Sequence, residues 1–369
     1  MTREDTLRTH AATLGFHRVG VAPAVDLTDD HARYRSFVEQ GAHGAMSWLA
    51  EHGEARLRVD SPDMLAGARS VIVCALAYHR EVDDGPPGPD GAVIARYARG
   101  QDYHNFFRKR LRRLAEWVRS EFPGSDARAV VDTAPLLERA WARLAGVGFV
   151  GKNGMIIVPG LGSYVLLGEV ITTVEFAADE PMASRCGECT RCLDGCPTNA
   201  FDSAYVLDAR RCVSYLTIEL RDAIPEPLRE GIGNRLFGCD VCQEVCPYNR
   251  TAAPPAESTA PFAMHPKWRS LDLETLVRMD DVSFRVLTEG SPLSRPRRAG
   301  LVRNAIVVMA NSRERRHLPV LREVVERDVD AMVRTTARWA IDTIERADTG
   351  ATKRASHDAG SDQGSRLPK

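Results

Sequence analysis

Eight of the nine cysteines lie in two runs between Cys186 and Cys246. This spacing is typical of a ferredoxin-like segment that holds two [4Fe–4S] clusters, in which the last cysteine of each run ligates the other cluster. Such clusters pass single electrons, so the pattern predicts electron transfer. The first run is Cys186-x2-Cys189-x2-Cys192-x3-Cys196, the second is Cys239-x2-Cys242-x3-Cys246, and Cys212 stands between them. One cluster is expected on Cys186, Cys189, Cys192 and Cys246, and the other on Cys196, Cys212, Cys239 and Cys242.

Eight cysteines could also form disulfides or bind zinc. A disulfide framework needs an oxidising compartment, and the polar start of the chain, Met1–Asp5, has no apolar segment typical of a secretory signal. Two four-cysteine zinc sites would use the same number of ligands. The three-cysteine run, the x3 step and the Cys-Pro endings favour clusters over zinc. The ninth cysteine, Cys74, lies in the apolar run Val71–Ala77 and is expected to be a packed thiol in a buried strand.

The composition is that of a soluble globular protein, with 369 residues, 44% hydrophobic and 27% charged. The chain is longer than a ferredoxin needs and can bury a sizeable core. No apolar run approaches the ~20 residues that span a bilayer. Because the net charge is only −1, a nucleic-acid partner would have to be held by a local basic patch. We expect a cytoplasmic monomer.

Four regions position these residues: an α/β (α+β) unit over 1–180, the cluster segment over 181–250, a helical region over 251–346 and a disordered tail over 347–369. A Gly/Pro-rich loop at 83–91 and a linker at 251–261 separate elements. Residue patterns predict helices over Glu4–Leu14, Phe106–Glu121 and Leu136–Ala145, and strands over Val71–Ala77, Ala129–Asp132, Met155–Val158 and Tyr164–Leu167.

The helical region contains a faint internal repeat. Val302–Ile306 and Val333–Ala337 have similar sequences and lie 31 residues apart. Two stacked helices of the HEAT kind would give this pattern, so we expect an all-α, HEAT-like region.

Two segments of the first unit could do chemistry. Asp132 follows an apolar strand and precedes a predicted helix, so it is either a helix cap or a functional acid at the end of a sheet strand; the residues alone favour the cap. Gly148–Gly154 is a glycine-rich turn without the Ser or Thr, and without the following helix, of a phosphate-binding loop. It indicates only a close backbone approach.

Several of these segments together resemble the epoxyqueuosine reductases, which catalyse the last step in the synthesis of the tRNA base queuosine. The resemblance covers residues 3–345. Besides the cysteines, it rests on Arg96–His104, Asp132–Arg139, Gly151–Asn153, Gly162–Tyr164, Leu167–Glu169 and Ser214–Glu219.

The resemblance implies a cobalamin in the first unit, two [4Fe–4S] clusters beside it and a tRNA substrate. It also implies that Asp132 is the proton donor. Converting an epoxide to an alkene takes two electrons and two protons, and the electron chemistry belongs to the cofactors. An acid that works near neutral pH needs a raised pKa, which we expect burial beside the corrin to supply.

Cobalamin contacts are expected from segments that resemble cofactor-lining parts of the family. For the apolar residues the alternative is core packing, and for Arg58 it is a solvated surface charge. The expected contacts are Arg58, Ala95, Asp132, Lys152, Asn153, Ile156 and Leu167.

The tRNA is expected to bind an arginine-rich stretch over 291–316, which has seven arginines and one acid. Arginines on a helical scaffold neutralise phosphates, although a solvated helix face would give the same composition. The modified base must also leave the stack of the anticodon loop to react. The expected phosphate contacts are Arg295, Arg297, Arg298 and Arg303.

The residues also allow two rival functions. Cobalamin-dependent reductive dehalogenases resemble the same pairing of corrin domain and double cluster, but usually carry a twin-arginine signal and need no arginine-rich helical extension. An electron-transfer protein would need neither cobalamin nor an acid. The expected partners are tRNA and an external donor such as a ferredoxin or flavodoxin.

Overall fold

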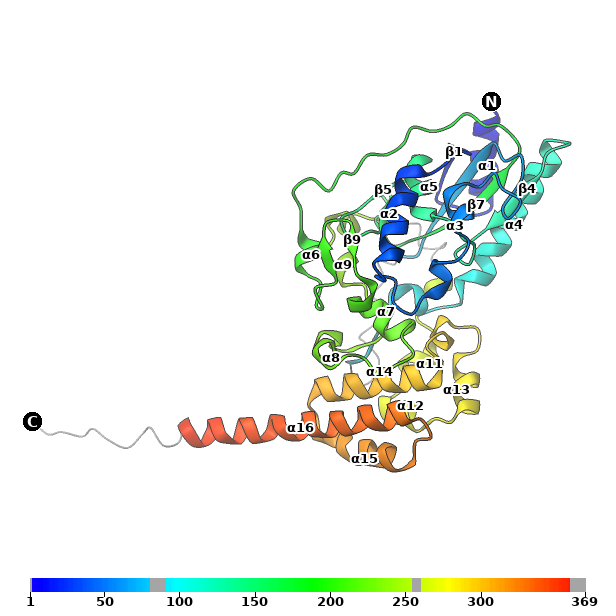
Figure 1. Cartoon of the computed structure of the whole chain (residues 1–369). Helices are drawn as coiled ribbons and strands as arrows, with labels where there is room; N and C mark the ends of the chain where they lie inside the picture. Colours follow the sequence, from blue (N-terminus) through cyan, green and yellow to red (C-terminus); the bar gives the residue numbers. More distant parts are fainter. Residues whose placement is uncertain (1, 80–90, 254–259, 359–369) are drawn as a thin grey trace, which may run out of the picture.

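The computed structural model describes residues 2–79, 91–253 and 260–358. Figure 1 shows a sheet-containing unit, a cysteine-bearing segment of short elements beside it, and a group of helices that extends into one long C-terminal helix. Parts of the expected loop at 83–91, linker at 251–261 and tail at 347–369 fall outside the described residues.

The central sheet has the strand order β1-β2-β7-β4, and every neighbouring pair is antiparallel. The first unit is therefore of the α+β kind. All eight residues of β2 are buried, which explains its unbroken apolar run. The strands are β1 (Arg18–Pro23), β2 (Ser70–Ala77), β7 (Val165–Thr172) and β4 (Ala127–Val130).

Helices cover both faces of this sheet. On one face, α1 (Arg3–Thr13) and α4 (Tyr103–Glu121) pack on the side that carries Cys74. Cys74 is fully buried, as expected for a packed thiol. On the other face, α5 (Glu138–Leu144) buries Trp141. Gly168 in β7 lets α4 approach closely, because a Cβ there would lie 2.5 Å from Leu111 Cδ1.

The remaining elements of the first unit include β3, which joins this unit to the cysteine segment. Strand β3 pairs in parallel with β10, so residues about 140 positions apart share one small sheet. These elements are α2 (Thr28–Glu39), η1 (Ser47–Leu49), α3 (Gly53–Leu57), β3 (Val93–Ile94), η3 (Arg96–Ala98), β5 (Phe149–Val150) and β6 (Ile156–Ile157).

The cysteine segment is built from one-turn helices and short strands. Such elements place cysteines on tight turns rather than on a continuous helix face. They are α6 (Arg191–Asp194), β8 (Phe201–Ser203), β9 (Val206–Leu207), η4 (Ala209–Arg211), α7 (Val213–Ile218), α8 (Glu226–Ile232), β10 (Arg235–Phe237), α9 (Val241–Glu244) and α10 (Pro247–Arg250).

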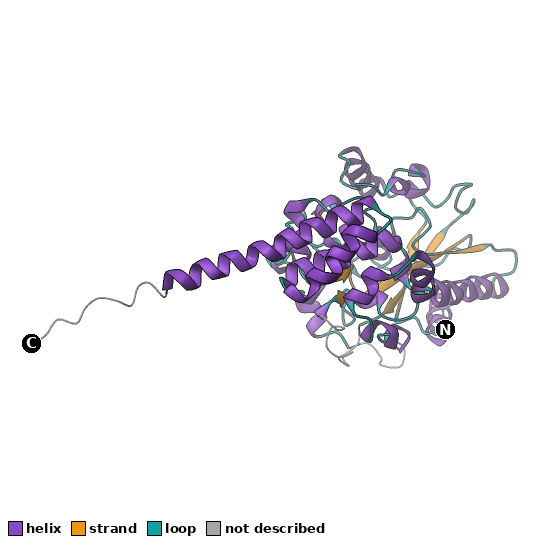
Figure 2. Cartoon of the chain, turned by 90° about the horizontal axis from the view of Figure 1, so that it is seen from below, coloured by secondary structure: helices purple, strands orange, loops and turns teal. Residues whose placement is uncertain are grey.

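The last part is helical, as Figure 2 shows, with the sheet behind it and the final helix projecting away. Helix α14 packs on α16, and the two copies of the faint repeat lie in these helices. A HEAT-like repeat stays a prediction. The helices are α11 (Pro266–Arg269), α12 (Leu273–Arg278), α13 (Asp281–Thr288), η6 (Pro292–Ser294), α14 (Arg297–Ser312), η7 (Arg315–His317), α15 (Leu318–Arg327) and α16 (Ala331–Asp358).

Helix α16 runs from Ala331 to Asp358 and so enters the tail that is expected to be disordered over 347–369. The disorder of that tail stays a prediction. In the part of the chain that the structure describes, no helix is long and apolar enough to cross a membrane.

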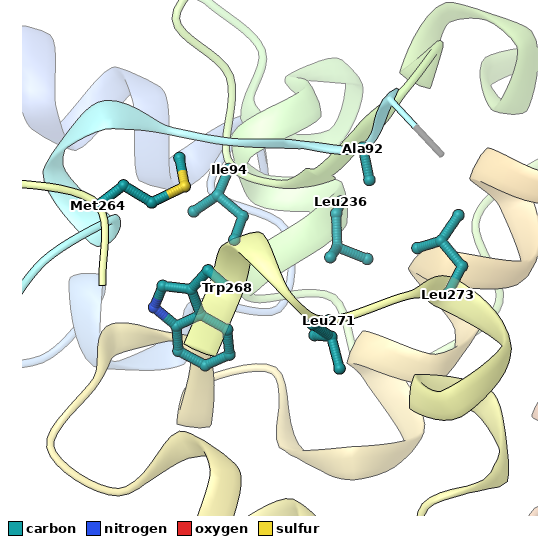
Figure 3. A pocket seen from close by; sticks show the side chains of 7 residues that line it. All are labelled: Ala92, Ile94, Leu236, Met264, Trp268, Leu271 and Leu273. Carbon is teal, nitrogen blue, oxygen red and sulfur yellow. The ribbon is translucent and has the colours of Figure 1, made fainter. Parts of the chain in front are cut away.

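A cavity of about 20 Å³ lies where β3 and β10 meet α11 and α12. Figure 3 shows its apolar lining, which includes Ile94, Leu236 and Trp268. This volume is about that of one water molecule. The cavity is therefore a packing gap in the core and not a substrate site.

Candidate active site

Asp132 lies just beyond the end of β4, which stops at Val130. It adopts a positive φ of 39°, which non-glycine residues rarely do. Helix α5 begins six residues later, at Glu138, and Leu137 occupies its N-cap position. The capping role favoured by the residues alone is therefore wrong, and the carboxyl group of Asp132 is available for another purpose.

Two side chains from the start of α4 meet the Asp132 carboxylate. The Tyr103 hydroxyl donates to Asp132 Oδ2 over 3.0 Å, and His104 Nε2 lies 2.8 Å from the same oxygen. The other ring nitrogen of His104, Nδ1, lies 2.7 Å from Asp102 Oδ1. Asp102 also caps α4 by accepting the backbone N–H of His104. The imidazole is thus held between two carboxylates.

This arrangement decides which group holds a proton. Hydrogen bonds to Asp102 and Asp132 raise the pKa of His104 to about 9. Burial alone would raise the pKa of Asp132, but the hydrogen bonds and charge of His104, with the Tyr103 hydroxyl, lower it overall. At neutral pH the protein therefore holds an imidazolium beside a carboxylate. In this structure the pKa of Asp132 is lowered because the nearby proton stays on His104, and the expected rise beside a bound corrin stays a prediction.

The Asp132 carboxylate is accessible to solvent. Half of its side chain is exposed (50%). Tyr103, which donates to it, packs edge to face against Tyr97 with ring centroids 6.2 Å apart. Aromatic rings therefore lie next to the exposed carboxylate.

The interactions of His104 with Asp102 and Asp132 give a prediction about stability. In the folded protein the pKa of His104 is raised from an ordinary value near 6.5 to about 9. Its stabilising effect is therefore complete below about pH 6.5 and is lost as the pH rises through about 9. We expect His104→Gln to lower the melting temperature clearly at pH 6.5 and hardly at pH 9.5. A difference that grows with pH in thermal melts would contradict the charge assignment.

The glycine turn connects the first unit to the cysteine segment. The Asn153 side-chain amide donates to the carbonyl of Cys242 over 3.3 Å, and the carbonyl of Lys152 accepts from the backbone N–H of Tyr205 over 2.8 Å. Asn153 is 5% exposed. The close backbone approach that the glycines indicated is therefore an approach to the cluster-bearing segment.

The other expected cobalamin contacts are scattered. Ala95 and Ile156 are 2% and 3% exposed, which matches core packing, and Leu167 is half-buried against the same core as Ile156. Arg58 is exposed at the end of α3 and pairs with Glu54. Their roles as cobalamin contacts stay a prediction.

The cysteines of the two runs influence one another's pKa. Burial raises the pKa of Cys192, and the charges of Cys186, Cys246 and Cys189 raise it further. Burial raises the pKa of Cys242, with contributions from Cys239, Cys212, Asp240 and Cys192. Cys196 contributes to raising the pKa of Cys212. Cys246 is therefore near cysteines of the first run and Cys196 is near Cys212, while the division into two crossed ligand sets stays a prediction.

The donor chemistry of these groups fits iron–sulfur clusters. The backbone N–H of Ala200 donates to Cys196 Sγ over 3.3 Å, a type of hydrogen bond that stabilises thiolate ligands. Within the described residues, no three His, Cys, Asp or Glu side chains gather tightly enough for a single metal ion.

The structure removes two of the four expected phosphate contacts. Arg303 is completely buried, and its guanidinium donates to the carbonyls of Leu216, Leu220 and Asp222. Arg298 is 9% exposed and forms a 2.5 Å ion pair with Asp328. Both arginines hold helices together. The composition of the stretch could not reveal this, because helix α14 turns part of its basic face inward.

The other two expected arginines lie on the surface. Arg295 pairs with Glu219 over 3.1 Å and stacks over the exposed ring of Trp48 at 5.0 Å. Arg297 is exposed at the start of α14. Burial lowers the pKa of Arg221, and the charges of Arg297 and Arg295 lower it further, so the three guanidinium groups are neighbours.

The residues that sequence reasoning missed are Tyr103, His104, Arg221, Trp48 and Glu138. Tyr103 and His104 lie in a segment that carried the family resemblance, and the pair Asp102-x-His104 before a helix was the available signal. Trp48 and Arg221 lie far from the arginine stretch in sequence. No local pattern connects them to it.

Two family models match the chain. One, described as "Epoxyqueuosine reductase QueG, DUF1730", matches residues 58–133, and the other, described as "4Fe-4S double cluster binding domain", matches residues 185–249. The first match ends just after Asp132, and the second contains all eight cysteines of the two groups.

Curated relatives match over most of their length. The epoxyqueuosine reductase of Xanthomonas campestris pv. campestris is 39% identical over 345 residues, which cover 91% of this chain and 94% of the relative. That of Gloeobacter violaceus is 41% identical over 303 residues, which cover 81% and 93%.

Solved structures of epoxyqueuosine reductases are also similar to this chain. An epoxyqueuosine reductase bound to an epoxyqueuosine-modified tRNA-Tyr stem loop superposes with a TM-score of 0.85 at 32% identity, covering 92% of this chain and 90% of that one. The Streptococcus thermophilus enzyme gives a TM-score of 0.81 at 29% identity, covering 94% and 91%. On the curated identities and their coverage, this chain belongs to the epoxyqueuosine reductase family.

Proposed function

We propose that this protein reduces the epoxide of epoxyqueuosine in tRNA, giving queuosine. The observation that carries the proposal is the half-exposed Asp132 carboxylate with the protonated His104 beside it, in a unit joined to a two-cluster segment. The reaction needs an electron source and a proton source at one place. The family membership identifies the substrate, because the relatives bear the name of this reaction.

Two [4Fe–4S] clusters, held by the two cysteine groups, would deliver electrons one at a time. Bound cobalamin, when reduced, supplies a strong nucleophile and two-electron chemistry. The exposed Asp132 carboxylate, with Tyr103 and Tyr97 beside it, is the place that we assign to this ligand. Among the other expected polar contacts, Lys152 on the glycine turn is partly exposed and Arg58 is exposed.

The side chains of this unit control the proton. Asp132 is half-exposed, and His104 contacts its carboxylate with the proton that its raised pKa retains. As negative charge develops on the oxygen that leaves the carbon, transfer of that proton through Asp132 neutralises it. Asp102 holds the imidazole in line from the other side. The Tyr103 hydroxyl, whose pKa burial raises, stays neutral and donates to Asp132 throughout.

The surface that would receive tRNA is formed by Trp48, Arg221, Arg295 and Arg297. Arg295 connects it to the acid site, since its charge contributes to lowering the pKa of Asp132. Single-stranded RNA loops bind where aromatic rings and guanidinium planes stack on bases and arginines neutralise phosphates. A solved relative holds a tRNA stem loop, which supports RNA as the partner. This surface replaces the four-arginine stretch expected from composition.

A charge reversal tests the surface. Arg297 is exposed and has no recorded partner among the described residues, so Arg297→Glu should leave the fold intact. We expect tRNA affinity to fall, and the slope of log affinity against log salt to become shallower by about one phosphate contact. Arg327→Glu, an exposed arginine on α15, is the matched control and should leave both unchanged. Equal effects of the two substitutions would exclude a specific surface.

The activity itself is tested by anaerobic incubation of the cluster-loaded protein with cobalamin, a low-potential reductant and tRNA that contains epoxyqueuosine, followed by nucleoside analysis. Queuosine should appear only when all components are present. A ferredoxin or flavodoxin is the expected natural donor in place of the chemical reductant. Formation of queuosine without added cobalamin by a cobalamin-free preparation would overturn the cofactor assignment.

A further inference from the structure

The loop that carries Asp132 is closed by one side chain. Glu138 Oε1 accepts the backbone N–H of Asp132 over 2.8 Å, which ties the catalytic carboxylate to the first residue of α5. Asp132 is the residue of this loop with a positive φ. A non-glycine residue keeps such a conformation only when surrounding contacts determine it. The recorded contact that restrains the Asp132 backbone from the far side of the loop is this hydrogen bond.

Glu138 is itself well placed to act as an anchor. It begins α5, whose next residues Ala140 and Trp141 are buried against the sheet. Its neighbour Arg139 donates to the carbonyl of Gly154 over 2.5 Å, which fixes the helix start to the glycine turn. The carboxyl group of Glu138 is therefore attached to a rigid base, whereas Asp132 lies on an irregular loop.

We propose that Glu138 is a positioning residue, which holds Asp132 in its left-handed conformation by accepting the Asp132 N–H and so keeps the Asp132 carboxylate on His104. Without this acceptor, Asp132 can relax to negative φ. A change in φ moves the side chain relative to its own backbone, and Oδ2 then leaves Tyr103 and His104. The catalytic part of this inference rests on the proposed role of Asp132 as the acid, whereas the anchoring of the loop does not.

The charges around Glu138 explain why the oxygen acceptor, and not the negative charge, is the useful feature. Burial raises the pKa of Glu138 to about 7, and the charge of Asp132 acts in the same direction, whereas the Asp132 N–H, Arg139 and His104 oppose it. Glu169, in the neighbouring strand β7, is completely buried, and burial followed by Glu138 raises its pKa well above the ordinary range. Either protonation state of Glu138 keeps a carbonyl-type oxygen for the Asp132 amide.

Two substitutions separate these features. Glu138→Gln keeps the size and the oxygen acceptor, whereas Glu138→Ala removes both. In the cluster-loaded protein without tRNA, we expect amide hydrogen exchange over 131–137 to be about tenfold faster in Glu138→Ala, and unchanged in Glu138→Gln. Turnover of modified tRNA should fall about 10²-fold in Glu138→Ala with little change in KM, because the acid is misplaced. Glu138→Gln should keep most of the turnover and of the pH profile.

The outcomes distinguish the anchor from the proposed chemistry. Equal exchange in both variants and the wild type would overturn the anchoring, whatever the activity. Equal loss of turnover in the two variants would assign the role to charge and would also overturn it. If exchange follows the expectation but Asp132→Asn remains fully active, Glu138 still anchors the loop, and the assignment of Asp132 as the acid fails instead.

Discussion

Replacing Asp132 with asparagine is expected to lower turnover of epoxyqueuosine tRNA by about 10²–10⁴-fold, the usual contribution of a positioned general acid. Asparagine has the same shape and can still accept the hydrogen bond from the Tyr103 hydroxyl. It cannot pass on a proton, and it also removes the charge that helps to keep His104 protonated. Single-turnover nucleoside analysis measures the loss directly.

The substitution should leave binding intact. Iron content, the cluster absorption spectrum and the affinity for tRNA should match those of the wild type, because Asp132 lies outside both cysteine groups. The titration of His104, followed by NMR, should move from about pH 9 toward its ordinary value once one carboxylate partner is gone.

A matched substitution separates proton transfer from orientation. Asp102→Asn removes the second partner of the same histidine but leaves Asp132 in place. We expect a smaller loss of turnover than in Asp132→Asn. If Asp132→Asn were nearly as active as the wild type and Asp102→Asn inactive, the proton would come from His104 alone.

Loss of cluster ligands is expected to abolish turnover, and pairs of substitutions test the crossed ligation. The wild type should bind about eight iron atoms per chain in two [4Fe–4S] clusters. Cys186→Ala with Cys246→Ala removes two ligands of one cluster and should leave about four iron atoms. Cys242→Ala with Cys246→Ala removes one ligand from each cluster, so little iron should remain. Iron analysis of anaerobically purified protein gives the result.

Ligation within each run would reverse these two results, because Cys242 and Cys246 would then share a cluster. Cys74→Ala is the control. Its thiol is fully buried between the sheet and α4, so iron content and turnover should not change. A loss of iron in that variant would mean that the substitution disturbs the fold and not a cluster.

Local sequence was sufficient where a pattern acts through neighbours along the chain. The apolar run Val71–Ala77 predicted β2, and the structure extends it by one residue, to Ser70. The helix predicted over Phe106–Glu121 is α4, which begins three residues earlier because Asp102 caps it. Strand β1 and helix α2 were missed. The helix carries no fully buried residue, so it has no marked apolar face for a sequence pattern to reveal.

The cysteine spacing determined two clusters by itself, because turns of two and three residues are short enough to fix the distances between ligands. The chemistry of Asp132 was not determined in this way. A carboxylate after a strand has the same sequence appearance as a helix cap, and only the distance of six residues to α5 excludes the cap. The direction of its pKa shift depended on His104, which the folding of α4 against the end of β4 brings to 2.8 Å.

The arginines are a second case that the sequence alone did not determine. Composition predicted a basic stretch, but the stretch folds into a helix that packs on α7, so Arg303 became a buried link to three carbonyl groups. Arg295 lies on the surface, where it stacks on Trp48 and lies near Arg221. Both of these residues come from distant segments of the chain. The sequence by itself therefore indicated two iron–sulfur clusters and the family, since both depend on short motifs, while the individual ligands stay a prediction. The tertiary structure decided which charges are exposed and where the proton resides, because burial and charge pairing are properties of residues far apart in the chain.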